Sequence, residues 1–497
     1  MINHEINRLI NFALKKSLIT EADKIYSTNM LLGLLNLNEF ETEEINEDLA
    51  TPTPILENIL DYAAENKMIE NTVTERDLFD TNIMNCVMPR PSEVINKFNE
   101  ILSKSPENAT DYYYNLSIAS NYIRKDRIDK NIIWKATTEY GDLDITINLS
   151  KPEKDPRDIA KAKLVKSSSY PKCLLCKENE GFYGTMNHPA RQTHRIIPLK
   201  FRDENWFLQY SPYTYYNEHC IILNGNHVPM KITRNTFDNL LSFTDILPHY
   251  FAGSNADLPI VGGSILSHDH YQGGHYTFAM EEAPIEKTYS INEYSNIEIG
   301  KVKWPMSVIR ISGDNKNELV DLADHILTAW RNYSDESVDI LSHTGDEPHN
   351  TITPIGRKRN GKYELDLVLR NNRTSKEHPL GIFHPHSEVH HIKKENIGLI
   401  EVMGLAVLPA RLKEELNLLK NYLLSNTKDI SKDEVVAKHS DWYNYIIEKY
   451  SDINENNAED ILRKEVGLKF LEVLNHAGVF KRDSEGSAGF DRFINTL

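Results

Sequence analysis

The sequence predicts an α+β protein, with a mainly antiparallel sheet core and flanking helices, plus a helical N-terminal region and a helical C-terminal segment. Apolar residues recur at helical spacing through the first 125 or so residues and again after about residue 400. Between about 165 and 400, short segments alternate apolar and polar residues, as half-buried strands do, and helical patterns separate some of them. Strands and helices mixed in this way are typical of the α+β class.

The N-terminal region repeats a helical pattern several times. Ile6, Leu9, Ile10 and Ala13 share one helical face, and the segment 55–63 does the same after Thr53-Pro54, where threonine can cap a helix. Prolines at 89, 91 and 106 separate further helices. Because no catalytic pattern occurs in this region, we interpret it as a helical cap or an interaction module.

The pattern changes to strands after Asp142. The clearest predicted strands are 143–149, 207–210, 220–223, 259–261 and 365–369. Helices are predicted at 236–243 and 318–330. After about residue 400, Leu412, Leu416 and Leu419 and the segment 458–474 again follow the helical period. The basic stretch 356–361 is compatible with a phosphate site, but its Asn360-Gly361 ending just before a strand favours a solvated hairpin turn.

Composition excludes several classes of protein. The chain has 497 residues, with 56 Lys and Arg against 73 Asp and Glu and a formal charge of -17, which gives a nucleic acid no general attraction. Its start lacks a basic region followed by a long apolar core, and no run approaches the roughly 18 apolar residues that span a bilayer. We therefore expect a cytoplasmic protein with no membrane partner. The four cysteines are too few for a disulfide framework, so reduced thiols are expected.

The stretch from His268 to Gln272 says most about function. In an extended backbone, His268, His270 and Gln272 lie on one face, because strand side chains alternate. One imidazole can then act as nucleophile, another as ligand or orienting group, and the amide as a donor to an oxyanion. Glycine pairs on both sides let a phosphate approach the main chain. A polar sheet edge with chance histidines is the alternative interpretation.

Cys173 and Cys176 form a CxxC pair, which fits half of a zinc site, a thioredoxin-like redox pair or a coincidence. The turn-like residues 177–181 that follow favour the metal. Tetrahedral zinc needs two more ligands, and His227, on a turn beyond the strand 220–223, would complete a closed Cys2His2 set together with His268.

A closed set leaves no open coordination position. Such a zinc would hold the fold and fix His268, leaving the chemistry to His270. His219 and Cys220 are the competing ligands, although Cys220 also fits a buried strand position.

These motifs resemble the galactose-1-phosphate uridylyltransferases of the histidine-triad superfamily. The resemblance rests on the CxxC, a downstream histidine and a Gly-rich approach to HxHxQ, and it runs from about residue 130 to 420. The stretches 187–191, 209–213, 216–220 and 262–274 are similar to the branch typical of Gram-positive bacteria, as is the long helical N-terminal region. The resemblance implies a helical region 1–130, a nucleotide-binding catalytic half 131–300, a second histidine-triad-like half 301–425 and a helical segment 426–497.

The resemblance also implies a double displacement. His270 would attack the α-phosphorus of UDP-glucose, release glucose 1-phosphate and form a uridylyl-histidine, from which galactose 1-phosphate would take the uridylyl group to give UDP-galactose. A histidine with a pKa of about 6.5 is mostly neutral near pH 7, so no strong base is needed. Its second nitrogen should donate to a carbonyl, and Gln272 would donate to a nonbridging phosphate oxygen. The resemblance also implies a homodimer.

Further residues are expected to bind substrate. Arg191 and Arg195 are basic candidates near the nucleotide, with surface salt bridges as the alternative, because guanidinium groups clamp phosphate oxygens. Ser264, Ser267 and Asn255 are candidates for phosphate contacts by hydroxyl, main-chain N–H or amide. Arg370, with Arg373 and Lys376, follows a strong predicted strand and would supply charge for the acceptor sugar phosphate.

Two features depart from the better-known branch of the family. Asp269 stands where that branch has proline, so a restriction on the backbone is lost, and residues 401–408 lack the aromatic and acidic residues used there on the hexose. A second His-Pro-His at 384–386 is followed by Glu388 instead of glutamine, so it does not match the nucleophile motif. We interpret it as a loop, with a second metal site as the alternative. The alternative functions are a dinucleoside polyphosphate phosphorylase with the same HxHxQ chemistry and a zinc-stapled binding protein without turnover.

Overall fold

The computed structural model describes all of the chain except residues 1, 151–156, 158–160, 162–168 and 264. The described chain divides into two compact units. Unit 1 contains residues 1–130, 150–229 and 267–270, and unit 2 contains 131–149, 230–266 and 271–497. The chain therefore passes from one unit to the other within the predicted HxHxQ motif.

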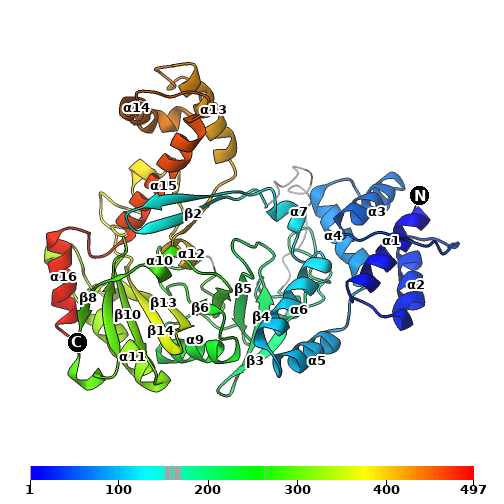
Figure 1. The fold of residues 1–497 in the computed structure, drawn as a ribbon, viewed down its shortest axis with the longest axis horizontal. Helices are drawn as coiled ribbons and strands as arrows, with labels where there is room; N and C mark the ends of the chain where they lie inside the picture. The colour runs from blue at the N-terminus through cyan, green and yellow to red at the C-terminus, as the bar shows by residue number, and fades with distance from the viewer. Residues whose placement is uncertain (1, 151–156, 158–160, 162–168, 264) are drawn as a thin grey trace. The chain divides into compact units, whose positions relative to one another are not determined.

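Unit 1 begins with the helices that the apolar spacing predicts (Figure 1). They are α1 (Ile2–Lys15), α2 (Lys24–Leu34), α3 (Thr53–Glu65), α4 (Val73–Asn85), α5 (Pro91–Leu102), α6 (Pro106–Ala119) and the short α7 (Lys125–Ile128). The predicted face of α1 is buried, and proline occupies the first turn of α3, α5 and α6, where the missing N–H costs nothing. The prediction of a helical N-terminal region is confirmed.

An antiparallel run of strands completes unit 1. The order is β3 (Ile197–Phe201), β4 (Glu204–Tyr210) and β5 (Cys220–Asn224). Helix α6 is tied to it by tyrosines: the Tyr113 hydroxyl lies 3.3 Å from the Leu208 carbonyl, and the Tyr210 hydroxyl donates to the Thr110 carbonyl at 3.1 Å. These bonds satisfy buried hydroxyl groups and anchor the helical region to the strands that precede the site.

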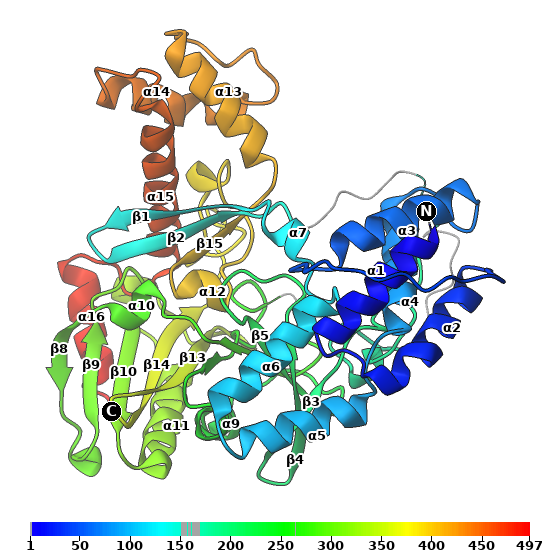
Figure 2. The same ribbon diagram turned by 45° about the vertical axis from the view of Figure 1, so that its right-hand side comes forward.

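The main sheet of unit 2 has the strand order β7-β6-β13-β14-β10-β9-β8, and every pairing in it is antiparallel. Figure 2 shows β8, β9, β10, β14 and β13 side by side in this sheet. The bounds are β7 (His270–Gly274), β6 (Phe251–Gly253), β13 (Asn350–Arg359), β14 (Lys362–Asn371), β10 (Val308–Gly313), β9 (Glu298–Val302) and β8 (Ile285–Tyr289). Helices α9 (Arg234–Ile246) and α11 (Lys316–Asn332) pack against β13, and Leu241, Ile326 and Trp330 from them are buried in the core. The predicted α+β class with a mainly antiparallel sheet is confirmed.

A smaller sheet in unit 2 has the order β1-β2-β15, with β1 (Ile132–Thr138), β2 (Gly141–Ile147) and β15 (Leu405–Leu408). The remaining elements are α10 (Ala279–Glu282), α12 (Leu399–Val402), the hairpin of β11 (His343–Thr344) and β12 (Glu347–Pro348), and the C-terminal helices α13 (Leu412–Leu424), α14 (Ser440–Lys449), α15 (Ala458–Ala477) and α16 (Ser484–Ile494). Helix α15 packs on β1, where a Cβ on Gly467 would lie 2.1 Å from the Cβ of Ala136. Only glycine permits this close approach.

One predicted strand and the predicted exposure of one arginine differ from the structure. Residues 259–261 form a turn instead of a strand, and Ile260 has a positive φ of 72°, which an extended strand excludes. The Asn360-Gly361 pair makes the expected hairpin turn between β13 and β14, with φ of 51° and 80°. Arg357 in the same basic stretch, however, is buried instead of solvated, because its guanidinium pairs with Asp366.

Among the residues described, no helix combines the length and the apolar character that crossing a membrane requires.

The buried carboxylate of Asp366 joins two arginines and should dominate the stability of the β10–β14–β13 region. It accepts from Arg310 at 2.6 and 2.9 Å and from Arg357 at 2.7 Å, and it has no exposed surface. We expect Asp366→Ala to lower the free energy of unfolding by up to about 3–5 kcal/mol, because two buried guanidinium groups lose one carboxylate partner and only Glu364 remains beside both of them. Urea denaturation measures this loss. The control Asp321→Ala breaks an exposed pair with Arg234 and should cost less than about 1 kcal/mol; equal effects of the two variants would contradict the prediction.

Candidate functional site

Unit 1 brings four predicted metal ligands together. The Sγ atoms of Cys173 and Cys176 are 3.6 Å apart, Cys173 Sγ lies 3.2 Å from His268 Nδ1, and Cys176 Sγ lies 3.2 Å from His227 Nδ1. All four ligand atoms lie within 4.8 Å of one another. A tetrahedral ion with bonds of about 2.3 Å to sulfur and about 2.0 Å to nitrogen separates its ligands by roughly 3.3–3.8 Å. The four residues therefore fit a tetrahedral metal ion.

Asn179 holds the CxxC segment in shape. Its Nδ2 donates to the carbonyl of Cys173 at 2.9 Å and to that of Cys176 at 2.7 Å, and its Oδ1 accepts from His188 Nε2 at 2.6 Å. The side chain is buried, so all three bonds replace bonds to water. The sequence shows residues 177–181 only as a turn, and a buried amide inside that turn is a feature that we did not predict.

The imidazole of His268 is oriented from both sides. Its Nε2 donates to the carbonyl of Asn224 at 2.8 Å, which leaves the lone pair on Nδ1, the atom that faces the two cysteines. A metal-binding histidine usually donates its other ring N–H to such an acceptor, which fixes the tautomer. His268 is 1% exposed, so this arrangement is shielded from water.

The main chain of His268 fixes the next histidine. His270 Nδ1 lies 2.7 Å from the carbonyl oxygen of His268, and only a protonated nitrogen can bond to that oxygen. The proton of a neutral His270 is therefore on Nδ1, and the lone pair is on Nε2. Burial lowers the pKa of His270 to about 4, so the ring is neutral near pH 7.

The peptide between His268 and Asp269 is itself anchored. The N–H of Asp269 donates to the carbonyl of Val228 at 2.7 Å, and the carbonyl of Asp269 accepts from the N–H of Asn224 at 3.0 Å. Because C=O and N–H point in opposite directions in a trans peptide, the bond to Val228 also sets the direction of the His268 carbonyl. Proline has no N–H and cannot make this bond. The restriction expected to be lost with proline is thus replaced by a main-chain hydrogen bond.

The strand of the motif begins later than predicted. Strand β7 starts at His270, while His268 and Asp269 precede it, so the shared strand face includes His270 and Gln272 only. Tyr271 faces the other way, is 2% exposed, and its hydroxyl accepts from Asn239 Nδ2 at 3.2 Å.

The two arginines predicted near the nucleotide lie in unit 1 in different surroundings. Arg195 is buried, with Nε bonded to the carbonyl of Pro89 and Nη1 to the carbonyls of Gln192 and His194. Arg191 is half-buried, and its guanidinium lies over the ring of Tyr122 at 5.7 Å. Arg195 therefore supports the surrounding main chain through its hydrogen bonds to three carbonyl groups.

Asn255 and Arg370 meet at one short segment of unit 2. Asn255 Oδ1 accepts from the N–H of Leu399, the first residue of α12, at 2.9 Å, and Arg370 Nη2 donates to the carbonyl of Ile397 at 3.0 Å. Burial lowers the pKa of Arg370 to about 10. Arg370 Nε is buried and has no hydrogen-bond partner among the residues described.

The other predicted substrate residues are spread over the chain. Ser264 lies outside the described residues, and Ser267 is exposed in the bend before His268. Arg373 donates to Asp339 at 2.6 and 3.2 Å, and Lys376 is exposed.

The rival metal ligands and the second His-Pro-His have other surroundings. Cys220 is buried in β5, and the ring of His219 packs against Tyr216 with centroids 4.5 Å apart. Residues 384–386 lie in a loop, as expected. That loop also brings His386 and Glu388 beside His476, and the ligand atoms of these three residues lie within 4.8 Å of one another.

Comparison with known proteins identifies the family. Residues 17–229 match the family model described as galactose-1-phosphate uridyl transferase, N-terminal domain, and residues 243–444 match the corresponding C-terminal domain. Proteins named galactose-1-phosphate uridylyltransferase are similar over the whole length. The one from Clostridium acetobutylicum is 73% identical, with 100% of both chains covered, and the one from Bacillus subtilis is 51% identical, covering 100% of this chain and 98% of the relative.

Among solved structures, yeast Ap4A phosphorylase is similar at a TM-score of 0.32 and 12% identity, covering 62% of this chain and 91% of that one. The two family models and the full-length relatives are much stronger matches. Because both family models and the full-length relatives match, this chain belongs to the galactose-1-phosphate uridylyltransferase family.

Proposed function

We propose that the protein transfers the uridylyl group of UDP-glucose to galactose 1-phosphate, with glucose 1-phosphate and UDP-galactose as products. The family and the names of the full-length relatives support this reaction. The observation that carries the mechanism is the contact between His270 Nδ1 and the carbonyl of His268 at 2.7 Å, which leaves a lone pair on Nε2 of a neutral ring.

The reaction proceeds in two displacements at phosphorus. In the first, His270 Nε2 forms a bond to the α-phosphorus of UDP-glucose while the bond to the oxygen of the leaving glucose 1-phosphate breaks. In the second, a phosphate oxygen of galactose 1-phosphate attacks the same phosphorus and the N–P bond breaks, which regenerates neutral His270. No base is needed to activate the nucleophile, because burial keeps the imidazole unprotonated.

Other residues bind and orient the substrates in this proposal. Gln272 shares the face of β7 with His270, and its amide N–H would stabilise a nonbridging phosphate oxygen. Arg191, Arg195, Asn255, Ser264, Ser267 and Arg370 stay as proposed substrate residues. Asn255 and Arg370 would act through the segment 397–399 that both hold.

We further propose that Cys173, Cys176, His227 and His268 hold a structural Zn²⁺. The donor set of two thiolates and two imidazoles suits zinc, and a closed set leaves no open position for substrate. When bound, the ion would cross-link three segments of unit 1 and keep the side chain of His268 in place. We expect the enzyme to act in the cytoplasm as a homodimer, without nucleic acid or membrane partners.

Incubation with UDP-glucose labelled at the α-phosphorus should leave acid-labile label on the protein. His270→Asn should retain the fold and lose the label, because asparagine offers no nucleophilic lone pair on nitrogen. His275→Asn, which alters another histidine close to the motif, is the matched control and should retain the label. Label that persists in His270→Asn would contradict the mechanism, and label from a diadenosine polyphosphate but not from UDP-glucose would favour a phosphorylase.

Metal removal should destabilise the protein. Chelator titration is expected to lower the melting temperature, with zinc found by elemental analysis before treatment. Asn179→Ala should lose the ion at a chelator concentration roughly 10- to 100-fold lower than the wild type does, because the main-chain carbonyls of both cysteines lose their hydrogen-bond donor. Asn187→Ala, at an exposed position nearby, is the control. A metal-free protein with an unchanged melting temperature would reject the proposed site.

A further inference from the structure

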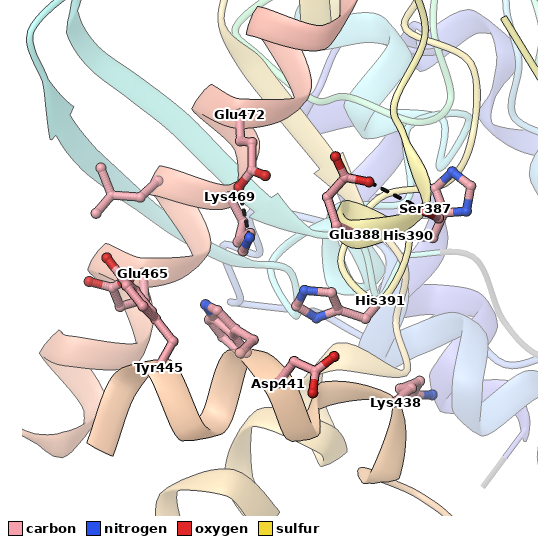
Figure 3. Close-up of a pocket in the computed structure, with 12 residues that line it drawn as sticks. Ser387, Glu388, His390, His391, Lys438, Asp441, Tyr445, Glu465, Lys469 and Glu472 are labelled. Atoms are coloured by element: carbon pink, nitrogen blue, oxygen red, sulfur yellow. Dashed lines mark hydrogen bonds and ion pairs between the residues drawn. The ribbon is translucent and has the colours of Figure 1, made fainter. Parts of the chain in front are cut away.

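A cavity of about 750 Å³ lies within unit 2, and none of its lining residues is among those assigned above to the reaction. Its walls come from the loop segment 387–391, from Lys438 just before α14, and from helices α14 and α15. Figure 3 shows the imidazole of His391 extending from that loop into the space between the two helices. Small-molecule sites commonly have volumes of roughly 300–1,000 Å³.

A chain of two hydrogen bonds, from Glu415 through His439, fixes the tautomer of His391. His439 Nε2 lies 3.0 Å from a carboxylate oxygen of Glu415, so this nitrogen carries the proton. His439 Nδ1 must then accept, and it lies 2.7 Å from His391 Nδ1, which therefore donates. Nε2 of His391 is left with a lone pair. Burial, with help from the neighbouring His439, lowers the pKa of His391 to about 3, so the ring remains neutral.

Two buried polar atoms on the cavity wall lack partners. His391 Nε2, an acceptor, and Trp442 Nε1–H, a donor, make no hydrogen bond with any described residue. Trp442 is 4% exposed, and its ring centroid lies 5.3 Å from that of His391. A hydroxyl group both donates and accepts, so one hydroxyl, or two on adjacent carbons, matches this pair of atoms.

The charges on the wall disfavour a phosphorylated ligand. Lys469 pairs with Glu472 at 2.7 Å and Lys438 with Glu415 at 2.5 Å, so both lysines that face the cavity already have carboxylate partners. Four carboxylates line the cavity, and Asp441 among them forms no ion pair within the described part of the chain. Carboxylates accept hydrogen bonds from hydroxyl groups and repel phosphate.

We propose that this cavity binds a neutral polyhydroxylated ligand of the hexose class, with a hydroxyl bridging Trp442 Nε1 and His391 Nε2 and further hydroxyls donating to Asp441. The site goes beyond the transfer reaction, in which the sugars carry phosphate. It lies in the helical C-terminal segment and the adjoining loop, for which the reaction provides no role.

Calorimetric titration of the full-length protein with galactose, glucose and galactose 1-phosphate tests the proposal. Galactose or glucose should bind saturably, and Trp442→Phe should weaken that binding roughly fivefold to tenfold, because the ring stays and only the N–H is lost. Asp441→Asn, at an exposed position, should also weaken it. Turnover and the affinity for galactose 1-phosphate should not change in either variant.

Trp134→Phe and Asp460→Asn are the matched controls, since neither residue lines the cavity. Absence of saturable binding of both neutral sugars would overturn the proposal. So would sugar binding that both Trp442→Phe and Asp441→Asn leave unchanged, because the sugar would then occupy another site. An affinity for galactose 1-phosphate that falls with Trp442→Phe would assign a phosphorylated ligand instead. Failure of the labelling of His270 would leave these results unaffected, so the two proposals are tested separately.

Discussion

The peptide unit between His268 and Asp269 is the constraint on which the rest of the site depends. Its carbonyl oxygen accepts a hydrogen bond from Nδ1–H of His270, and its N–H donates a hydrogen bond to the carbonyl oxygen of Val228. The side chain of the same His268 lies in the four-residue metal group. One residue therefore links the candidate metal-binding group to the tautomer of the nearby imidazole of His270. A rotation of this peptide would remove the acceptor for Nδ1 and allow the proton to move to Nε2, which would take away the lone pair that the proposed mechanism requires.

The structure shows how the middle position of the motif can be restricted without proline. Proline limits the backbone at the middle position by its ring, whereas Asp269 limits it by donating a hydrogen bond that proline lacks. Two asparagines support the residues around this peptide. Asn224 bonds to both the ring of His268 and the main chain of Asp269, and Asn179 bonds to both cysteine carbonyls. These hydrogen bonds restrict the motions that would turn the ring of His270 away from a bound substrate, as the proposed attack requires.

Local pattern predicts much of this fold and some of the site. Helices such as α1 and α15 and strands such as β5 and β14 follow from apolar spacing, because burial of one face dominates their energetics. The grouping of the four candidate metal ligands follows from residue type, since two cysteines and two histidines are a common donor set for zinc and the structure brings their ligand atoms within 4.8 Å of one another. Ile260 could not be placed from pattern, because its apolar neighbours resemble a strand while the chain turns there with positive φ.

Roles that arise from tertiary contacts are invisible in the sequence. Asn179 and Arg357 look like surface residues of turns, yet the first holds two carbonyls and the second is buried beside Asp366. The linkage of Glu415, His439 and His391 joins residues up to 48 positions apart and has no motif. Whether a polar residue is a surface group or a buried support depends on which segments pack beside it, which a single sequence does not encode locally.

Isotope exchange tests the proposed covalent uridylyl-histidine most directly. The protein is mixed with UDP-glucose and labelled glucose 1-phosphate, without galactose 1-phosphate, and the label in UDP-glucose is followed. A double displacement through His270 predicts exchange in the wild type and none in His270→Asn, since the first half-reaction is reversible by itself. Exchange that requires galactose 1-phosphate, or that continues after His270 is replaced, would contradict it.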